Sequence, residues 1–342
     1  MILDLIQTLM HAVANAPSES RFAKSGLVTR ALTQLLGFER SDPRQPETSP
    51  SAEHSRLSQT VTRPLSDGER NELLDHIESV IFSGEFKVSG PHRKPDWEAG
   101  WGENLANLES AQSPNVSSEL LPKYFGKSNF LRIGGVHVSS PSSDKLESEL
   151  LSVLVDSLVL FLNQTYVAES LYEFGCGTGH HLVRLRRIMP EAKLVGLDWA
   201  ESSQKILAEI SRRMEDPLLV GENFDFFSPK SNLVVNDKSI FLTVASLEQV
   251  GHSFGPFLDF VLKAKPSVVV HVEPIEELLG GSREEELSKL YFKKRGYLTG
   301  YLSALLKLEA EGKVRIVAAE RTGLGSLFIE GYSVIVWEPV FG

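Results

Sequence analysis

The sequence contains one cysteine, Cys176, among its 342 residues, and it has no long uninterrupted apolar run. A single cysteine excludes an internal disulfide, and a free thiol is typical of a reducing compartment, so we expect a cytoplasmic protein. A helix that crosses a membrane needs about 18 or more consecutive apolar residues. The start of the chain also lacks the basic region of a secretory signal, so we expect no membrane partner.

Positive charge is also scarce. The chain has 35 Lys and Arg against 45 Asp and Glu, which gives a net charge of -10. The two basic patches, "RLRR" at 184–187 and "FKKR" at 292–295, are short. Binding along a nucleic-acid backbone needs clustered cations that displace counterions, so we expect no nucleic-acid partner.

The composition is that of a globular protein, with 42% hydrophobic residues. Residues 1–38 have apolar positions at helical spacing, and Ser66 with Glu69 forms a capping-box pattern before a further helix. Between them, at about residues 40–66, the chain is rich in Pro, Ser and Thr, which is typical of a flexible linker. We interpret residues 1–115 as a helical N-terminal region containing this linker.

Trp97 and Trp101 lie close together in that region and are followed by further aromatic residues. Such aromatic density usually indicates packing against another domain or subunit. We therefore expect residues 1–115 to act as a cap or lid over residues 116–342, or as a homodimer contact.

After about residue 140, short apolar runs alternate with helical patterns. The runs "SLYEF", "KLVGLD", "SIFLTVA" and "PSVVVHVEP" are typical of buried parallel strands, and the last 26 residues before Val340 read as an antiparallel hairpin. The predicted fold class is α/β: a Rossmann-like, seven-stranded, mostly parallel sheet with a C-terminal antiparallel hairpin, preceded by a helical N-terminal region.

The stretch "YEFGCGTGHHL" at 172–182 follows the first of these strands. A dinucleotide fingerprint has glycines at its first, third and sixth positions. Counted from Gly175 the sixth position is His180, and counted from Gly177 it is Leu182. The pattern therefore argues against a nicotinamide-dependent oxidoreductase, which stays as a less favoured alternative.

Glycines at every second position after an acid resemble the first motif of class I S-adenosylmethionine-dependent methyltransferases, over roughly residues 165–342. The resemblance implies S-adenosylmethionine as cofactor and a bacterial branch that acts on small molecules or saccharides. Asp198 ends the next predicted strand, where ribose hydroxyls need an acceptor, and "NFDFF" is similar to the family's adenine-binding stretch. The expected cofactor-binding residues are Glu173, Gly175, Gly177, Gly179, Asp198, Asp225 and Phe226.

Residues for acceptor chemistry are expected where the later strands end. His271 and Glu273 lie on one face of a strand that Pro274 terminates, and they form a candidate base and orienting pair. A histidine buried with a structural hydrogen bond is an equally weighted alternative. In "SLEQVG", Glu248 and Gln249 resemble the family's residues that line the path from sulfonium to acceptor. Glu248 is a third candidate for catalysis, and Gln249 is expected to contact the substrate.

Further substrate contacts are expected from Tyr291 and Arg295 on one helix and from Arg321 in the terminal hairpin, because a guanidinium offers a fork of donors to an anionic or hydroxylated acceptor. No close cluster has metal-ligand spacing, so no metal is expected. The predicted function is methylation of oxygen or nitrogen on a small molecule. The alternative from another class is a catalytically silent, methyltransferase-like binding subunit.

Overall fold

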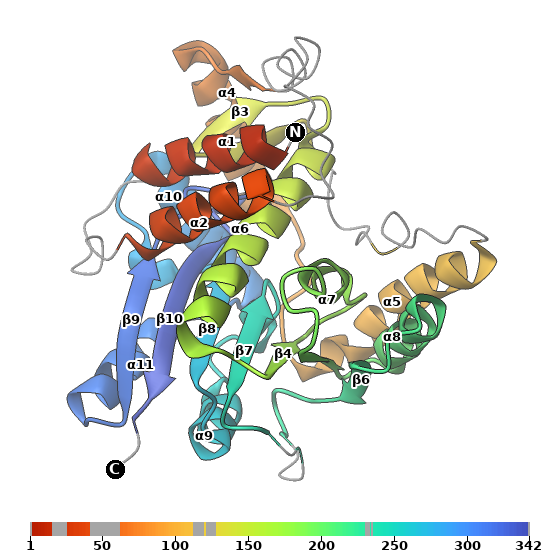
Figure 1. Cartoon of the computed structure of the whole chain (residues 1–342). Helices are drawn as coiled ribbons and strands as arrows, with labels where there is room; N and C mark the ends of the chain where they lie inside the picture. The colour runs from red at the N-terminus through yellow and green to blue at the C-terminus, as the bar shows by residue number, and fades with distance from the viewer. Residues whose placement is uncertain are drawn as a thin grey trace.

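The computed structural model describes residues 2–15, 26–41, 62–111, 120, 128–229, 233 and 235–340. A seven-stranded sheet lies at its centre (Figure 1), with the strand order β6-β5-β4-β7-β8-β10-β9. The strands are β4 (Ser170–Phe174), β5 (Lys193–Asp198), β6 (Leu219–Asn223), β7 (Ser239–Val244), β8 (Val268–Glu273), β9 (Val314–Glu320) and β10 (Ser333–Pro339).

Strands β4 to β8 pair in parallel, whereas β10 is antiparallel to both β8 and β9. The predicted Rossmann-like sheet and its C-terminal antiparallel hairpin are therefore confirmed. The four apolar runs named from the sequence form β4, β5, β7 and β8. The structure adds that β10 inserts between β8 and β9.

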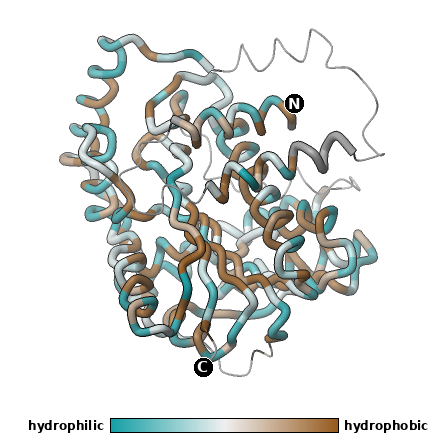
Figure 2. Tube along the Cα trace, turned by 60° about the vertical axis from the view of Figure 1, so that its left-hand side comes forward, coloured by the Kyte–Doolittle hydropathy of each residue, from teal (hydrophilic) through white to brown (hydrophobic). Residues whose placement is uncertain are grey.

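Side chains along the strands alternate between two apolar clusters, one on each face of the sheet. Leu194 and Ile240 belong to one cluster, and their chain neighbours Val195 and Phe241 belong to the other. Because both faces are covered, the central strands are apolar at consecutive positions. Figure 2 shows this continuous hydrophobic centre as brown strands.

The first face is covered by α6 (Ser143–Tyr166), α7 (His180–Leu185) and α8 (Glu201–Met214), and by the N-terminal helices α1 (Ile2–Asn15) and α2 (Leu27–Ser41). The two N-terminal helices lie against α6 (Figure 1) and share its apolar cluster through buried residues such as Ile6, Leu9 and Leu32. The predicted pair of N-terminal helices is confirmed, and both are part of the main core.

The opposite face is covered by α9 (Gly255–Ala264) and α11 (Tyr301–Ala310), which bury Phe257, Val261, Tyr301 and Leu305 against it. A third cluster joins α4 (Asp67–Ser83) to α10 (Arg283–Arg295). The predicted capping box begins α4, with Ser66 and Glu69 bonded reciprocally. Most of the predicted linker, residues 42–61, lies outside the described residues.

β1 (Arg63–Pro64), β3 (Val136–Ser139) and β2 (Phe130–Ile133) form a small antiparallel sheet, and Phe130 packs against the cluster that joins α4 to α10. The helix α5 (Lys94–Ser110) runs along α8 (Figure 1). The remaining short helices are η1 (Pro91–Arg93), η2 (Leu247–Val250) and η3 (Glu276–Leu278).

Within the described ranges, no helix is both long enough and apolar enough to cross a membrane. The same residues contain no group of three or more His, Cys, Asp or Glu side chains placed to hold a metal ion.

Candidate functional site

A pocket of about 540 Å³ lies at the carboxyl ends of the parallel strands, where ligands of open α/β sheets bind. Its walls come from the glycine turn after β4, the ends of β5 and β7, the helix α5, the end of α10 and the connection between β9 and β10. The pocket gathers residues that the sequence places far apart. Of the predicted site residues, it is lined by Glu173, Gly175, Gly177, Asp198, Phe226, Glu248, Gln249, Tyr291 and Arg295.

The glycine turn has a left-handed backbone that favours glycine. Gly177 has φ +54°, and a Cβ placed there would lie 2.7 Å from Cζ2 of Trp101. At Gly179, with φ +73°, a Cβ would lie 2.5 Å from Cδ2 of Leu207. These glycines therefore make room for the protein's own side chains.

Glu173, the acid before the turn, is buried with an unused oxygen. Its Oε1 lies 3.6 Å from Nδ1 of His181, and its Oε2 has no hydrogen-bond partner among the described residues. Burial and the nearby Asp198 raise the pKa of Glu173 to about 8. A buried carboxyl without partners is costly, and such a group points to an external partner.

Asp198 ends β5 and accepts two backbone hydrogen bonds. Its Oδ2 accepts from the Gly177 amide at 3.0 Å, and its Oδ1 accepts from the Ala200 amide at 2.9 Å. Burial raises its pKa to about 6, although these amides act in the opposite direction. Each oxygen keeps a further lone pair, so Asp198 both ties the glycine turn to β5 and can accept a ligand hydroxyl.

Three aromatic side chains line the pocket near Asp198. Trp199 and Phe227 are stacked with ring centroids 5.9 Å apart, and Phe226 packs edge-on against Phe257 at 4.9 Å. Phe226 was predicted from the sequence, whereas Trp199 and Phe227 were not. Asp225 lies outside the pocket lining, because its Oδ1 accepts the Phe227 amide in a local turn.

Glu248 is a buried carboxyl of the pocket whose pKa is raised. It lies in η2, is 8% exposed and accepts a 2.8 Å hydrogen bond from Nε2 of Gln249. Burial and the neighbouring Glu273 raise its pKa to about 8. The backbone just before η2 is strained, since Ala245 has φ +45°.

Glu273 has a structural role, because backbone amides occupy its carboxylate. It is fully buried and does not line the pocket. Its carboxylate accepts backbone hydrogen bonds from Ser246, Leu247 and Glu248 at 3.0–3.2 Å. Glu273 therefore holds the segment that presents Glu248, and the structure does not place it within reach of an acceptor.

His271 lies on the far side of the sheet from the first cluster, fully buried and outside the pocket lining. Its Nε2 accepts from Nε1 of Trp337 at 3.0 Å and lies 2.8 Å from the Tyr301 hydroxyl, while Nδ1 lies 2.9 Å from Oγ1 of Thr243. Because indole nitrogen only donates, Nε2 carries no proton. Burial lowers the pKa of His271 to about 3. The base role is corrected in favour of the structural alternative.

Arg321 is likewise removed from the pocket, because two carboxylates occupy its guanidinium. Nε and Nη2 donate to the two oxygens of Glu330 at 2.9 and 2.6 Å, and Nη1 donates to Glu285. This buried cluster anchors the connection between β9 and β10. Residues 326–329, 331 and 332 of that connection do line the pocket, as the sequence predicted for the hairpin.

One pocket residue, Glu147, could not be recognised from its local sequence. Glu147, on α6, accepts a 2.7 Å hydrogen bond from the Tyr332 hydroxyl, and burial raises its pKa to about 7. The sequence around Glu147 looks like an ordinary amphipathic helix. Only its contact with Tyr332, which is 185 residues away in the sequence, shows that this carboxyl faces the pocket.

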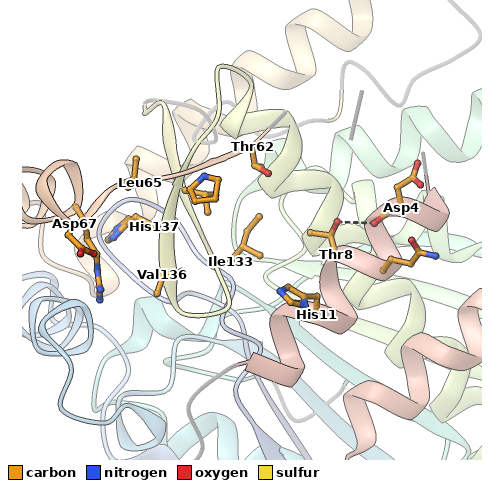
Figure 3. Close-up of a pocket in the computed structure, with 13 residues that line it drawn as sticks. Asp4, Thr8, His11, Thr62, Leu65, Asp67, Ile133, Val136 and His137 are labelled. Carbon is orange, nitrogen blue, oxygen red and sulfur yellow. Dashed lines mark hydrogen bonds between the residues drawn. The ribbon is translucent and has the colours of Figure 1, made fainter. Parts of the chain in front are cut away.

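A second cavity of about 620 Å³ lies between α1, the start of α4 and the small sheet. Figure 3 shows Asp4, Thr8 and His11 from α1 on one side, Ile133 of the small sheet next to them, and His137 on the far side beside Asp67. None of the predicted site residues lines this cavity, so the pocket at the strand ends is the candidate site.

No protein-family model matches the sequence, and no curated protein matches it. Among solved structures, the chain is similar to the [4+2]-cyclase SpnF, with 12% identity, a TM-score of 0.45 and coverage of 75% of this chain and 98% of that one. It is also similar to geranyl diphosphate methyltransferase in complex with S-adenosylmethionine (13% identity, TM-score 0.39, 59% and 93% coverage). A third example is a methyltransferase from Aquifex aeolicus, with 14% identity, a TM-score of 0.36 and coverage of 52% of this chain and 88% of that one.

The architecture itself is given by the strand order of the sheet and by the antiparallel β10 between β8 and β9. The chain therefore has a Rossmann-like fold with seven mostly parallel strands, consistent with the fold of class I S-adenosylmethionine-dependent methyltransferases.

Proposed function

We propose that this protein is an S-adenosylmethionine-dependent methyltransferase that methylates an oxygen or nitrogen atom of a small molecule. The observation that carries the proposal is the carboxyl of Glu173. It is 3% exposed, faces the pocket at the glycine turn and has an oxygen without a partner in the described part of the chain. A positively charged ligand group would supply that partner.

The other residues at this end of the pocket fit the rest of such a cofactor. Asp198 has lone pairs left for ribose hydroxyls, and Trp199, Phe226 and Phe227 offer aromatic surface for a purine. Glu173 would hold the cationic amino-acid part. Asp225, which the resemblance assigned to the adenine amino group, is engaged in its own turn.

The cofactor, when bound, supplies an electrophilic methyl group. The protein must then orient the acceptor and remove one proton from it. Glu248 is the pocket carboxyl best placed for proton removal, because Gln249 orients it and Glu273 holds its backbone. Its pKa of about 8 gives it a proton affinity suited to work near neutral pH.

We assign the predicted lid function to α5 within residues 1–115. Glu98 of α5 accepts the backbone amides of Glu201 and Ser202 at the start of α8, at 2.7 and 3.1 Å. At the other end of α8, Arg213 donates to the carbonyls of Leu108 and Ala111, in the last turn of α5 and just after it. Held at both ends, α5 places Trp97 and Trp101 in the pocket wall.

Several features support a small-molecule acceptor. The pocket of about 540 Å³ has the volume of a small-molecule site, and it combines aromatic and aliphatic side chains with polar ones. The net charge of -10 is unfavourable for nucleic-acid binding. The free thiol of Cys176 is buried, in keeping with the proposed cytoplasmic location.

The test is calorimetric titration of the full chain with S-adenosylmethionine and its demethylated product, with NAD as the control ligand. We expect both sulfur ligands to bind and NAD not to bind. An Asp198→Asn variant, which keeps the shape of the side chain, should bind both ligands about tenfold or more weakly. NAD binding would favour the oxidoreductase alternative. If none of the three binds, the silent-subunit alternative takes the place of the enzyme.

A further inference from the structure

Arg295 occupies an unusual position at the end of α10. Its chain neighbours Lys293 and Lys294 are exposed, which is typical of cations in the last turn of a helix. Arg295 is half-buried and lines the pocket. Its guanidinium carbon lies 4.9 Å from the ring centroid of Tyr297 and 5.7 Å from that of Tyr291. The guanidinium is therefore held between two phenol rings inside the pocket wall.

The hydrogen-bonding capacity of Arg295 is only partly used. Nη1 donates to the Tyr291 hydroxyl at 2.9 Å, and Nε is buried without an acceptor in the described part of the chain. No described carboxylate lies within 4.0 Å of its nitrogens, in contrast to Arg93, the other arginine of the pocket lining, which is paired with Asp96 at 2.6 Å.

The nearest pocket acid does not neutralise Arg295. Glu248 acts on Arg295 only through space, as the smallest of the influences on its pKa. Burial and Glu273 raise the pKa of Glu248 to about 8, so its negative charge is weakened as a partner for Arg295. A half-buried guanidinium without a counter-charge is unfavourable unless a ligand supplies one.

Arg321 shows what a structural arginine looks like in this protein. It is buried, and two glutamates take up its donors. Arg295 has the opposite arrangement, since two aromatic rings fix the direction of its guanidinium and leave its donors available. A rigid guanidinium with free donors matches the planar oxygens of a carboxylate or a phosphate.

We propose that Arg295 binds an anionic group of the methyl acceptor, a carboxylate or a phosphate, in the part of the pocket formed by Tyr291, Tyr297 and Glu248. The inference rests on the proposed function and narrows its acceptor to small anionic molecules. The anion would pair with Arg295, while the reacting hydroxyl or amine would face Glu248.

The test uses three simple aromatic probes, because Tyr291, Tyr297 and Phe328 present ring surfaces to this part of the pocket. Benzoate carries a carboxylate, phenyl phosphate carries a phosphate, and benzamide is a neutral analogue of benzoate. Each is titrated into the full chain saturated with S-adenosylhomocysteine. We expect at least one anion to bind about tenfold or more tightly than benzamide, and the stronger of the two identifies the class of anion.

In Arg295→Gln, the favoured anion should lose its advantage over benzamide, a loss of about 10- to 100-fold in affinity, while benzamide binding stays the same. The matched control is Arg212→Gln, which removes the same charge from an exposed arginine of α8 that is paired with Glu209. The control should bind all three probes like the original protein. Equal binding of anions and benzamide, or an Arg295→Gln variant that keeps the preference, would overturn the proposal.

Two further measurements cover the cases in which Arg295→Gln does not fold or S-adenosylhomocysteine does not bind. If Arg295→Gln does not fold, Arg295→Lys keeps the charge without the planar fork, and a reduced preference for the favoured anion supports the proposal while an unchanged preference contradicts it. S-adenosylhomocysteine binding is measured separately. If it fails, the proposed function falls, and the probes are titrated without it. If it succeeds and no anion is preferred, only the assignment of Arg295 falls.

Discussion

The ends of β4 and β8 each carry a buried glutamate, and the two are used in opposite ways. Glu273 of β8 accepts hydrogen bonds from three successive backbone amides and lies outside the pocket. Glu173 of β4 faces the pocket, and one of its oxygens has no partner among the described residues. Burial raises the pKa of both carboxyls.

The comparison teaches that burial and a raised pKa do not by themselves identify a functional carboxyl. What separates the two glutamates is whether the protein satisfies their oxygens. A satisfied carboxylate stabilises the fold, whereas an unsatisfied one reduces stability and is available to a ligand. The same reasoning separates Arg321 from Arg295.

The largest effect is expected at Glu273. Glu273→Gln keeps the shape of the side chain but replaces one acceptor oxygen by an NH₂ group that faces backbone donors. At least one buried amide then loses its acceptor, so the free energy of unfolding should fall by about 2–3 kcal/mol. Urea denaturation followed by circular dichroism measures this. A change below about 0.5 kcal/mol would show that these hydrogen bonds do not hold the segment before η2.

Glu173→Gln should show the opposite behaviour. Its free energy of unfolding should change by less than about 1 kcal/mol, because no hydrogen bond to Oε2 is lost. Its affinity for S-adenosylmethionine should fall about 10- to 30-fold, because the charge that pairs with the ligand's amino group is removed. Denaturation and calorimetry on the same preparation give both values. Unchanged affinity together with a large loss of stability would make Glu173 a second structural glutamate.

The smallest effect is a pH dependence of cofactor binding. Glu173 has a pKa raised to about 8, and only its ionised form attracts a cation, so below pH 8 binding must release a proton. Affinity for S-adenosylhomocysteine should therefore rise about fivefold between pH 7 and 8 and then level off. His181 contributes nothing in this range, because burial lowers its pKa well below 6.5.

Titration in two buffers of different ionisation enthalpy counts the released protons. Glu173→Gln is the control and should release none between pH 7 and 8. Asp198 has a pKa of about 6, so its own contribution ends at lower pH. An affinity that falls as pH rises would contradict the proposed pairing.

Much of the fold could be predicted from the sequence because the central strands are buried on both faces. β4, β5, β7 and β8 appear as continuous apolar runs. The strand β6 was not predicted, because it lies at the sheet edge and only its first residue, Leu219, is buried. The position of β10 between β8 and β9 depends on long-range pairing that no local pattern reports.

The candidate site was predicted in part, and the errors have a common cause. Of the residues expected from the sequence and the resemblance, Glu173, Asp198, Glu248 and Arg295 line the pocket. His271 and Arg321 have equally suggestive local surroundings, but Trp337 and Glu330, their decisive partners, come from elsewhere in the sheet or the hairpin. Glu147 was missed because Tyr332, its partner, is 185 residues away.

The sequence by itself therefore determined the class of fold, the glycine turn and the acids that end β4 and β5, because these depend on local backbone geometry and on the apolar pattern of each strand. Only the tertiary structure decided which buried polar groups are satisfied. The partners of Glu273, His271 and Arg321 occupy their donors and acceptors, whereas Glu173 and Arg295 retain unused ones in the pocket. Hydrogen-bond satisfaction depends on contacts between distant segments, and those contacts exist only once the chain has folded.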